Sequence, residues 1–210
     1  MFKQHHAFLL ILLFCPQPLS ADVVVDNSSI GFYNDQIGTL LNGTSNLFPT
    51  TGDPTIDPAP EPDLASANSI LGSWLTSPNS LNANWTGPQL IPLNWTVGEE
   101  NAIIYEFDAG AGYNDFLVEI GVDNGAFVWL DGTYLGGHLR SGTAILGELS
   151  LDVGNVSAGI HHLQILREDH GTTSGYTINV TATAVPEPSG TLLLAFAIGI
   201  LGKRRRKNAR

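Results

Sequence analysis

The chain has 210 residues, with nine Lys and Arg against twenty Asp and Glu, a formal net charge of −11 and a single Cys. Between residues 22 and 202, Arg140 and Arg167 are the only basic residues among all twenty acidic ones, so the formal charge of this region is −18. Such a surface repels nucleic-acid phosphates and anionic lipids, and we expect no nucleic-acid partner. It either stays solvated or attracts cations.

Residues 1–21 have the pattern of a secretory signal peptide. Lys3 supplies a positive charge, Ala7 to Cys15 form an apolar stretch, and Leu19-Ser20-Ala21 ends in a small residue that suits signal peptidase. We therefore expect the exported chain to begin near Asp22. Its only Cys is then removed, so the domain has no disulfide and depends on its hydrophobic core.

Residues 22–184 are predicted to form one extracellular domain. Val23-Val24-Val25 predicts a first strand, and residues 34–63 are dominated by Gly, Asn, Thr, Pro and Asp. Because five prolines in this segment cannot donate to a sheet and few of its residues are apolar, we expect a long surface loop. Apolar residues at helical spacing from Ser66 to Leu75 predict one short helix.

Two similar tripeptides follow, Asn84-Trp85-Thr86 and Asn94-Trp95-Thr96. Trp85 and Trp95 on exposed loops would offer aromatic rings on which sugars stack. Tryptophan is, however, usually largely buried, so the favoured interpretation is that the two rings close the open end of a sandwich.

Beyond Glu100 the chain alternates between β-rich segments and turns of Gly, Asn and Asp. Six strands are predicted, at residues 102–107, 116–122, 126–130, 144–153, 160–167 and 176–182. The turns at Asp123-Asn124-Gly125 and Asp131-Gly132 are typical of hairpins, which predicts an antiparallel meander. With one or two earlier strands, these segments predict an all-β, jelly-roll-like antiparallel sandwich.

The run from Asp123 to Gly132, followed by Ala158 to Ile165, resembles the late strands of galactose-binding-like jelly rolls and, more distantly, of PA14 domains. The resemblance covers roughly residues 103–183. In PA14-type adhesins it implies a pair of aspartates that holds calcium beside a sugar. Here the pair is Asp123 and Asn124, so one carboxylate is absent, and these two residues with the two tryptophans are the candidate sugar-binding residues.

No local signature of a catalytic site is present, and the chain is expected not to be an enzyme and to need no cofactor other than calcium in the lectin alternative. His161 and His162 are adjacent on a strand, so their side chains point to opposite faces and are expected to be packed residues rather than a metal pair. Asp169 and His170, in the following turn, could join a weak metal cluster, although solvated turn residues are the ordinary case.

Near the C-terminus, Pro186-Glu187-Pro188 is followed by an uncharged stretch, residues 189–202, and by the basic cluster Lys203, Arg204, Arg205, Arg206 and Lys207. This order of features in residues 185–210 resembles a PEP-CTERM sorting signal. At about 1.5 Å per residue the stretch spans about 21 Å, which is short for a bilayer core of about 30 Å. The resemblance implies an exosortase-type processing enzyme and transient insertion into the inner membrane, with the basic cluster on the cytoplasmic side. An ordinary single-span anchor is the alternative.

These observations predict an exported, non-catalytic protein of the cell surface or extracellular matrix that associates with exopolysaccharide or biofilm. The first alternative is a calcium-assisted, lectin-like module. An extracellular glycan hydrolase that uses carboxylates such as Glu99, Glu100, Glu106 and Asp108 is a further alternative, but nothing in the sequence fixes their separation.

Overall fold

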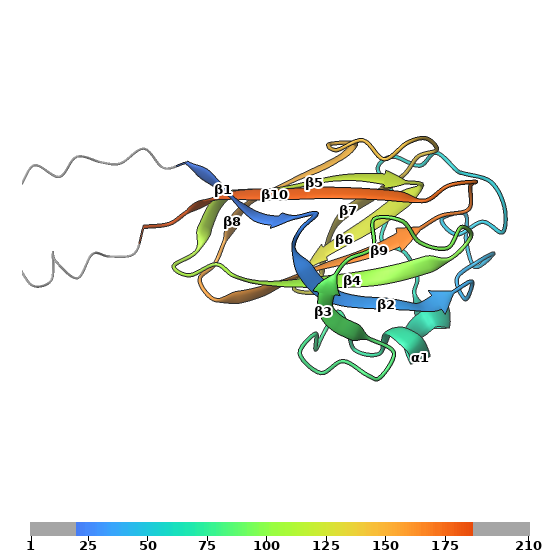
Figure 1. The fold of residues 1–210 in the computed structure, drawn as a ribbon, viewed down its shortest axis with the longest axis horizontal. Helices are drawn as coiled ribbons and strands as arrows, with labels where there is room; N and C mark the ends of the chain where they lie inside the picture. Colours follow the sequence, from blue (N-terminus) through green and yellow to red (C-terminus); the bar gives the residue numbers. More distant parts are fainter. Residues whose placement is uncertain (1–19, 187–210) are drawn as a thin grey trace, which may run out of the picture.

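Two antiparallel sheets stack face to face in the computed structural model, which describes residues 20–186 (Figure 1). The four-stranded sheet has the order β1 (Ala21–Asp26), β10 (Gly175–Ala184), β5 (Tyr113–Asp123) and β8 (Leu149–Val156). The six-stranded sheet has the order β3 (Thr86–Leu90), β2 (Ile30–Gly38), β4 (Glu100–Asp108), β9 (Ile160–Glu168), β6 (Gly125–Leu130) and β7 (Thr133–Leu139). The predicted all-β antiparallel sandwich is confirmed.

The main core lies between the two sheets. Alternate residues of β10 are buried, among them Ile178 and Val180, while the residues between them are partly exposed. β5 contributes Val118 and Ile120 from the same sheet. Because successive side chains of a strand point to opposite faces, this alternation places one face of the sheet in the core and leaves the other toward solvent.

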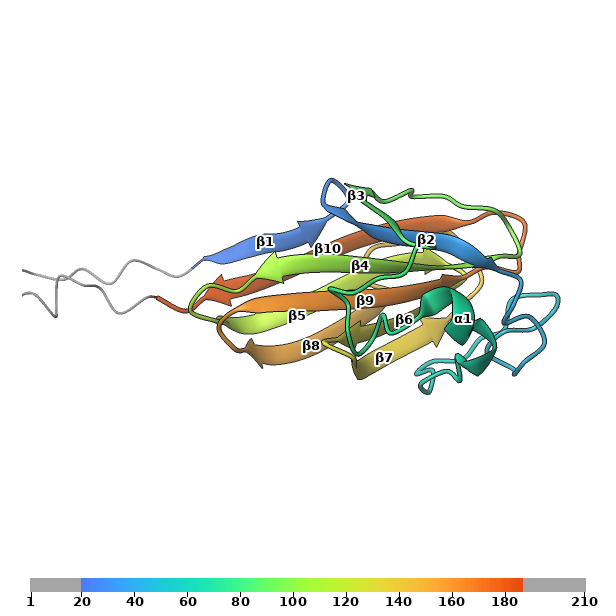
Figure 2. The same ribbon diagram turned by 90° about the horizontal axis from the view of Figure 1, so that it is seen from below.

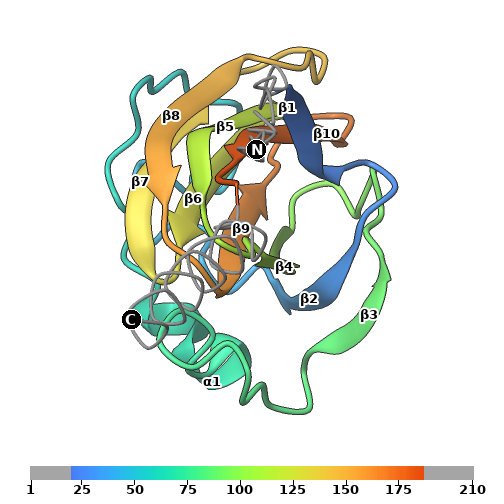
Figure 3. The same ribbon diagram turned by 90° about the vertical axis from the view of Figure 1, so that its left-hand side faces the viewer.

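The six-stranded sheet is covered on both faces, as Figures 2 and 3 show from two directions. Its central strand β9 is buried from His161 to Glu168, because the four-stranded sheet covers one face and residues 39–85 cover the other. The segment at residues 34–63 therefore differs from the predicted surface loop. Residues 34–38 belong to β2, and Leu41 and Phe48 are completely buried against the sheet.

The predicted helix is present but shorter than expected. A single 3-10 turn, η1 (Ala65–Ala67), leads into α1 (Asn68–Leu71), which ends at Gly72 with a φ of 62°. Neither element has a side-chain cap. A helix of this length is not stable by itself, so it depends on Leu71 and the following Trp74. Both are buried in the outer core, the apolar cluster between residues 39–85 and the face of the six-stranded sheet that points away from the four-stranded sheet.

The two predicted turns have different outcomes. Asp131 and Gly132 have φ values of 49° and 76° and connect β6 to β7 in a hairpin, as predicted. The turn at Asp123-Asn124 does not form a hairpin, because β5 pairs with β10 and β8 whereas β6 pairs with β7 and β9. The chain instead crosses from one sheet to the other here, and the predicted meander is wrong at this point.

Four further differences concern the strands. β2, β3 and β7 were not among the strands predicted from the sequence. The strand expected at residues 144–153 begins only at Leu149, because the amide of Glu148 donates to the carbonyl of Ile145 in a turn and Gly147 has a φ of 90°. The remaining predicted strands agree with the structure to within about three residues at each end.

The two ends of the described chain lie side by side. Ala21 of β1 pairs with Thr183 of β10, so residues 21 and 184 are at the same end of the sandwich, on the left in Figure 1. Asp123 and its partner Gly175 lie at the opposite end. Residues 1–19 of the predicted signal peptide and residues 187–210 of the predicted sorting signal lie outside the described residues. Within residues 20–186, no helix is long and apolar enough to cross a bilayer.

Candidate functional site

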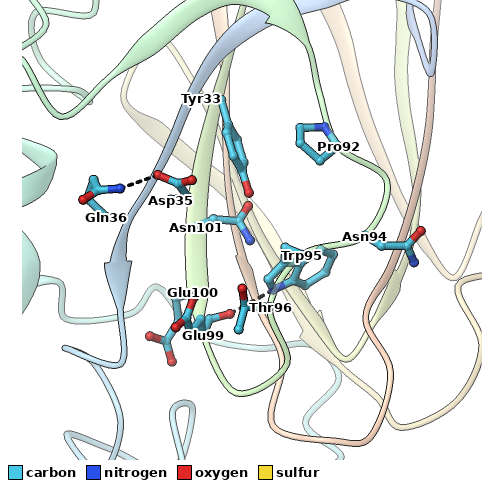
Figure 4. A pocket seen from close by; sticks show the side chains of 10 residues that line it. All are labelled: Tyr33, Asp35, Gln36, Pro92, Asn94, Trp95, Thr96, Glu99, Glu100 and Asn101. Atoms are coloured by element: carbon cyan, nitrogen blue, oxygen red, sulfur yellow. Dashed lines mark hydrogen bonds between the residues drawn. The ribbon is translucent and has the colours of Figure 1, made fainter.

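A cavity of about 450 Å³ lies at the end of the sandwich opposite to residues 21 and 184 (Figure 4). The end of β2, the start of β4 and the loop at residues 91–99 form its walls. Its rim is exposed and its floor is buried. The lining side chains are Tyr33, Asp35, Gln36, Pro92, Asn94, Trp95, Thr96, Glu99, Glu100 and Asn101.

Hydrogen bonds to both the side chain and the backbone of Trp95 fix this residue in the wall. Its indole Nε1 donates to the carbonyl of Glu99 at 2.9 Å. Its backbone amide donates to the hydroxyl of Ser174 at 2.8 Å, and that hydroxyl donates in turn to the carbonyl of Trp95 at 2.7 Å. The loop is thus tied to the segment before β10, and the half-buried indole is held in a defined position.

The guanidinium of Arg167, on β9, lies beneath Trp95. It is fully buried, and its central carbon is 4.3 Å from the centre of the Trp95 ring and 4.6 Å from that of Tyr176. Nε donates to Asn101 Oδ1 at 2.7 Å and Nη1 to the Pro92 carbonyl at 2.8 Å. Burial lowers the pKa of Arg167, but a guanidinium stays protonated in proteins, so the aromatic rings face a positive charge.

Several polar atoms at the floor of the cavity have no hydrogen-bond partner within the described residues. They are both carboxylate oxygens of Glu100 and Nδ2 of Asn101; Nη2 of Arg167, which lies beneath the lining residues, is also without a partner. Figure 4 shows the amide of Asn101 close to the rings of Tyr33 and Trp95. Unpaired polar groups in a buried position are costly, so these groups can bond to water or to a ligand that enters the cavity.

A buried ionisable cluster lies behind Glu100. His170 is bonded through Nδ1 to Glu168 at 2.6 Å and through Nε2 to Asn42 at 2.9 Å, and its Nε2 is 3.5 Å from Glu100 Oε1. Burial raises the pKa of Glu100 to about 8, against the opposing charge of His170. Burial by itself would lower the pKa of His170, but Glu168 and then Glu100 outweigh it and raise that pKa. Glu100 therefore keeps its proton at neutral pH.

Asp123 and Asn124 lie at the same end of the molecule as Trp95. Asp123 accepts hydrogen bonds from Asn124 Nδ2 and the Thr173 hydroxyl, each at 3.0 Å, and Asn124 Oδ1 accepts from the His170 amide at 3.1 Å. Thr173 precedes Ser174, the partner of Trp95. Residues 169–174 therefore connect Trp95, Asp123 and Asn124, three of the sequence-predicted site residues. Asp123 and Asn124, however, do not line the cavity.

The residues around Asp123 do not fit a calcium site. Calcium takes about six to eight oxygen ligands, whereas the side-chain oxygens of Asp123 and Asn124 already accept hydrogen bonds from protein donors. In residues 20–186, no group of three or more His, Cys, Asp or Glu side chains is arranged to hold a metal ion. We therefore derive no step through calcium.

Trp85 lies apart from the cavity, in the outer core. It is 8% exposed, its ring is 5.8 Å from that of Trp74, and its Nε1 donates to the Leu71 carbonyl at 3.1 Å. The structure thus places the two predicted tryptophans in different environments. Only Trp95 offers part of its ring to a cavity.

His161 and His162 lie at the opposite end of the sandwich. His161 Nδ1 is 2.6 Å from Asp131 Oδ2, and the Ser157 hydroxyl is 3.5 Å from His161 Nε2. This arrangement has the residue types of a serine-nucleophile triad, but Nε2 is closer, at 2.9 Å, to the Ser157 carbonyl. A nitrogen that donates to a carbonyl cannot take the serine proton, so the geometry is that of a structural turn.

His162 contacts Asn79 and Glu106 beside a second cavity of about 450 Å³ at this end. Of the carboxylates considered for hydrolysis, Glu99 and Glu100 line the first cavity. Glu100 begins β4, and Glu106 lies near the other end of that strand. The structure therefore does not bring all four together.

Arg167, Asn101 and Tyr33 were not among the sequence-predicted site residues. Arg167 carried a signal that could have been used, since it is one of only two basic residues between residues 22 and 202 and ends an apolar strand. A charge in such a position is usually paired or functional. Asn101 and Tyr33 carried no comparable signal.

No family model matches the chain, and no curated protein sequence matches it either. Among solved structures it is similar to the Podospora anserina GH26-CBM35 beta-(1,4)-mannanase, with 20% identity, a TM-score of 0.27 and 42% of this chain covered. It is also similar to a GH2 beta-galacturonidase from Eisenbergiella tayi, with 15% identity, a TM-score of 0.35 and 81% covered. The chain spans only 20% and 26% of the lengths of these two proteins.

A PA14 sugar-binding domain from an RTX adhesin is also among the similar structures, with 9% identity, a TM-score of 0.33, and 74% of this chain and 91% of that chain covered. The neighbours thus include a PA14 domain, the class that the sequence resembles. All three TM-scores lie below 0.5, so no conclusion about the activity of this chain rests on these similarities.

Proposed function

We propose that the domain is a non-catalytic binding module for extracellular polysaccharide, exported and sorted by its two terminal signals. The observation that carries this proposal is the cavity around Trp95, in which an aromatic ring lies among polar side chains. Sugars are bound by this combination, because a ring packs on the apolar face of a pyranose while polar groups bond its hydroxyls.

The size and polarity of the cavity support the same function. Ligand cavities in proteins usually measure about 300–1,000 Å³, and this one, at about 450 Å³, suits one or two sugar rings. Its unpaired floor atoms include both an amide donor and carboxylate acceptors. A polyhydroxylated ligand can donate and accept at the same time, so it can satisfy both kinds of atom.

Binding at this cavity is tested with Thr96→Trp in the full exported protein. Thr96 is an exposed rim residue, so the indole should block the cavity without disturbing the core. We expect retention on the extracellular polysaccharide of the producing cells to fall at least tenfold. Thr133→Trp, at an exposed position of the opposite end, is the matched control and should bind like the wild type.

Trp95→Leu is the second variant. It removes the aromatic face but keeps an apolar side chain over Arg167, and it should lose binding while thermal melting shows a folded protein. Trp85→Leu should lower the melting temperature but leave the binding of the folded fraction unchanged, because Trp85 belongs to the outer core. Polysaccharide retention that is equal in Thr96→Trp, Trp95→Leu and the wild type would rule out the cavity as the binding site.

The calcium-assisted lectin is the second candidate, and it is favoured by the position of Asp123 and Asn124 beside the loop that holds Trp95. Retention measured with calcium and with a chelator separates the two. We expect no difference, because the side-chain oxygens of Asp123 and Asn124 are engaged within the protein. A loss of binding in chelator would favour the lectin and would require these oxygens to change partners.

The proposed location is the cell envelope or extracellular matrix, after processing by signal peptidase and an exosortase-type enzyme. It rests on the sequence patterns at both ends of the chain. The intact mass of the protein recovered from its cells tests it. A chain from about Asp22 to about Pro188 agrees with sorting, whereas a chain that still carries Lys203 to Arg210 would mean a resident anchor.

A further inference from the structure

The charged side chains that line the Trp95 cavity all belong to acidic residues. They are Asp35, Glu99 and Glu100, and the cavity lining contains no Lys, Arg or His among the described residues. The nearest guanidinium, that of Arg167, lies beneath Trp95, fully buried and bonded to Asn101 and Pro92. The cavity therefore presents negative charge to a ligand.

The environment of Glu100 is the strongest single observation for a ligand that donates hydrogen bonds. Its side chain is fully buried, and neither carboxylate oxygen has a hydrogen-bond donor within the described residues. The nearest cationic group is His170, whose Nε2 is 3.5 Å from Oε1 and is already bonded to Asn42 at 2.9 Å. A buried carboxyl group without donors is unfavourable, so a donor from a ligand would be strongly favoured.

The donor set indicates an organic cation rather than a metal ion. No group of three or more His, Cys, Asp or Glu within residues 20–186 could hold a metal. An alkylammonium group needs only about three acceptors, which carboxylate and carbonyl oxygens supply. Attached to a sugar ring, it would lie beside an aromatic ring, where cation–π attraction also contributes.

We propose that the cavity binds glycans with free amino groups, such as glucosamine-containing polysaccharide, with the ammonium group held by Glu100 and the rim carboxylates Asp35 and Glu99, and a sugar ring on Trp95. This inference rests on the proposed function and specifies its ligand class. The formal charge of −18 between residues 22 and 202 attracts a polycationic chain from a distance, and the cavity selects the sugar.

The test compares two probes with the same backbone, a β-1,4-linked glucosamine hexamer and its fully N-acetylated form. Binding to the full exported protein is measured by calorimetry at pH 6 and physiological salt. We expect the glucosamine hexamer to bind at least tenfold more tightly. Glu100→Gln and Asp35→Asn should each weaken its binding about tenfold without changing the shape of the cavity. Asp35→Asn removes a carboxylate, and Glu100→Gln removes a carboxyl group that is protonated at this pH in the free protein and gives its proton to the solvent when the ammonium group binds.

Asp152→Asn is the matched control, because it removes one exposed carboxylate of β8, outside the cavity, and should leave both affinities unchanged. A loss in Asp152→Asn equal to that in Asp35→Asn would mean attraction to the whole acidic surface and would overturn the inference. Melting curves of each variant show that the protein is folded.

The remaining outcomes separate this inference from the proposed function. Equal affinity for the two hexamers, or tighter binding of the acetylated one, would overturn the amino-sugar inference and leave the binding module intact. If neither hexamer binds and native polysaccharide is not retained either, the proposed function itself fails.

Discussion

At the scale of single residues, Arg167 determines how the Trp95 cavity is built. Its guanidinium contacts both sheets at this end of the sandwich. It donates a hydrogen bond to Asn101 of β4 in one sheet and faces the ring of Tyr176 of β10 in the other. Its third contact, with Trp95, fixes the loop that forms the cavity wall. No carboxylate is bonded to this buried charge in the described residues, so the aromatic rings and carbonyl groups replace an ion pair.

We expect Arg167→Lys to lower the free energy of unfolding by about 2 kcal/mol, because a Lys ammonium cannot reproduce both directed hydrogen bonds and the planar stacking. Arg140→Lys is the matched control at an exposed position, and its effect should stay within about 0.5 kcal/mol. Urea denaturation measures both. Equal stabilities of the two variants would show that Arg167 does not organise this end of the molecule.

Glu100 makes the stability of the domain depend on pH. Its folded pKa of about 8 lies above the ordinary value of 4.5, so the folded state favours the protonated form. The contribution of Glu100 to the free energy of unfolding is then fully present below about pH 4.5 and is lost as the pH rises toward 8. The raised pKa values of His170 and Glu168 act in the same direction, since the stability that each contributes is lost as the pH rises through the folded pKa.

We therefore expect the domain to be less stable at pH 8 than at pH 5, by about 1–3 kcal/mol. Glu100→Gln cannot ionise, so its melting temperature should vary less between these pH values and should exceed that of the wild type at pH 8. Thermal melting across this range is the measurement. An unchanged pH dependence in Glu100→Gln would assign the effect to other groups.

At the scale of elements, the segment from residue 39 to residue 85 is a structural cover rather than a surface loop. It contains only η1 and α1 as regular structure, yet it buries Leu41, Phe48 and Trp74 against the six-stranded sheet. Phe48 lies with its ring 5.5 Å from that of Phe127 of β6. Without this cover, the outer face of the sheet would expose a large apolar surface.

Phe48→Ala should destabilise the domain by about 3–5 kcal/mol, the usual cost of removing a buried aromatic ring. Leu40→Ala, in the same segment but 46% exposed, should change stability by no more than about 0.5 kcal/mol. Chemical denaturation distinguishes the two. A small effect of Phe48→Ala would mean that the segment is not part of the cooperative core.

Most strands after residue 100 could be predicted because their apolar residues alternate and Gly, Asn or Asp residues separate them; β7 was not among them. β2 could not, because Asn34, Asp35 and Gln36 resemble a loop, and pairing with β3 and β4 makes this segment a strand. The sequence predicts a hairpin at Asp123, because a turn of Asp, Asn and Gly suits a hairpin and a crossing between sheets equally well. Which sheet the next strand joins depends on distant strands.

The candidate site was less predictable than the fold. Trp95 could be named from its position on a loop, but the same pattern named Trp85, which lies in the outer core. The acidic floor at Glu100 depends on the packing of β4 against residues 168–170 and the segment near Asn42. No local sequence pattern carries such a contact.

At the scale of the whole molecule, the two ends of the sandwich differ. Residues 21 and 184, which continue toward the predicted signal and sorting segments, lie at one end, and the Trp95 cavity lies at the other (Figure 1). β10 has ten residues, which at about 3.3 Å each separates the ends by about 30 Å. A chain held at a membrane through its C-terminal tail would therefore present the cavity away from that membrane.

Hydrogen–deuterium exchange of the full exported protein, with and without its native polysaccharide, tests this account most directly. We expect protection of residues 33–36 and 92–101, which line the cavity, and no change at residues 131–133 and 157–162 of the opposite end. Protection confined to the opposite end, or no protection anywhere at saturating polysaccharide, would contradict the account.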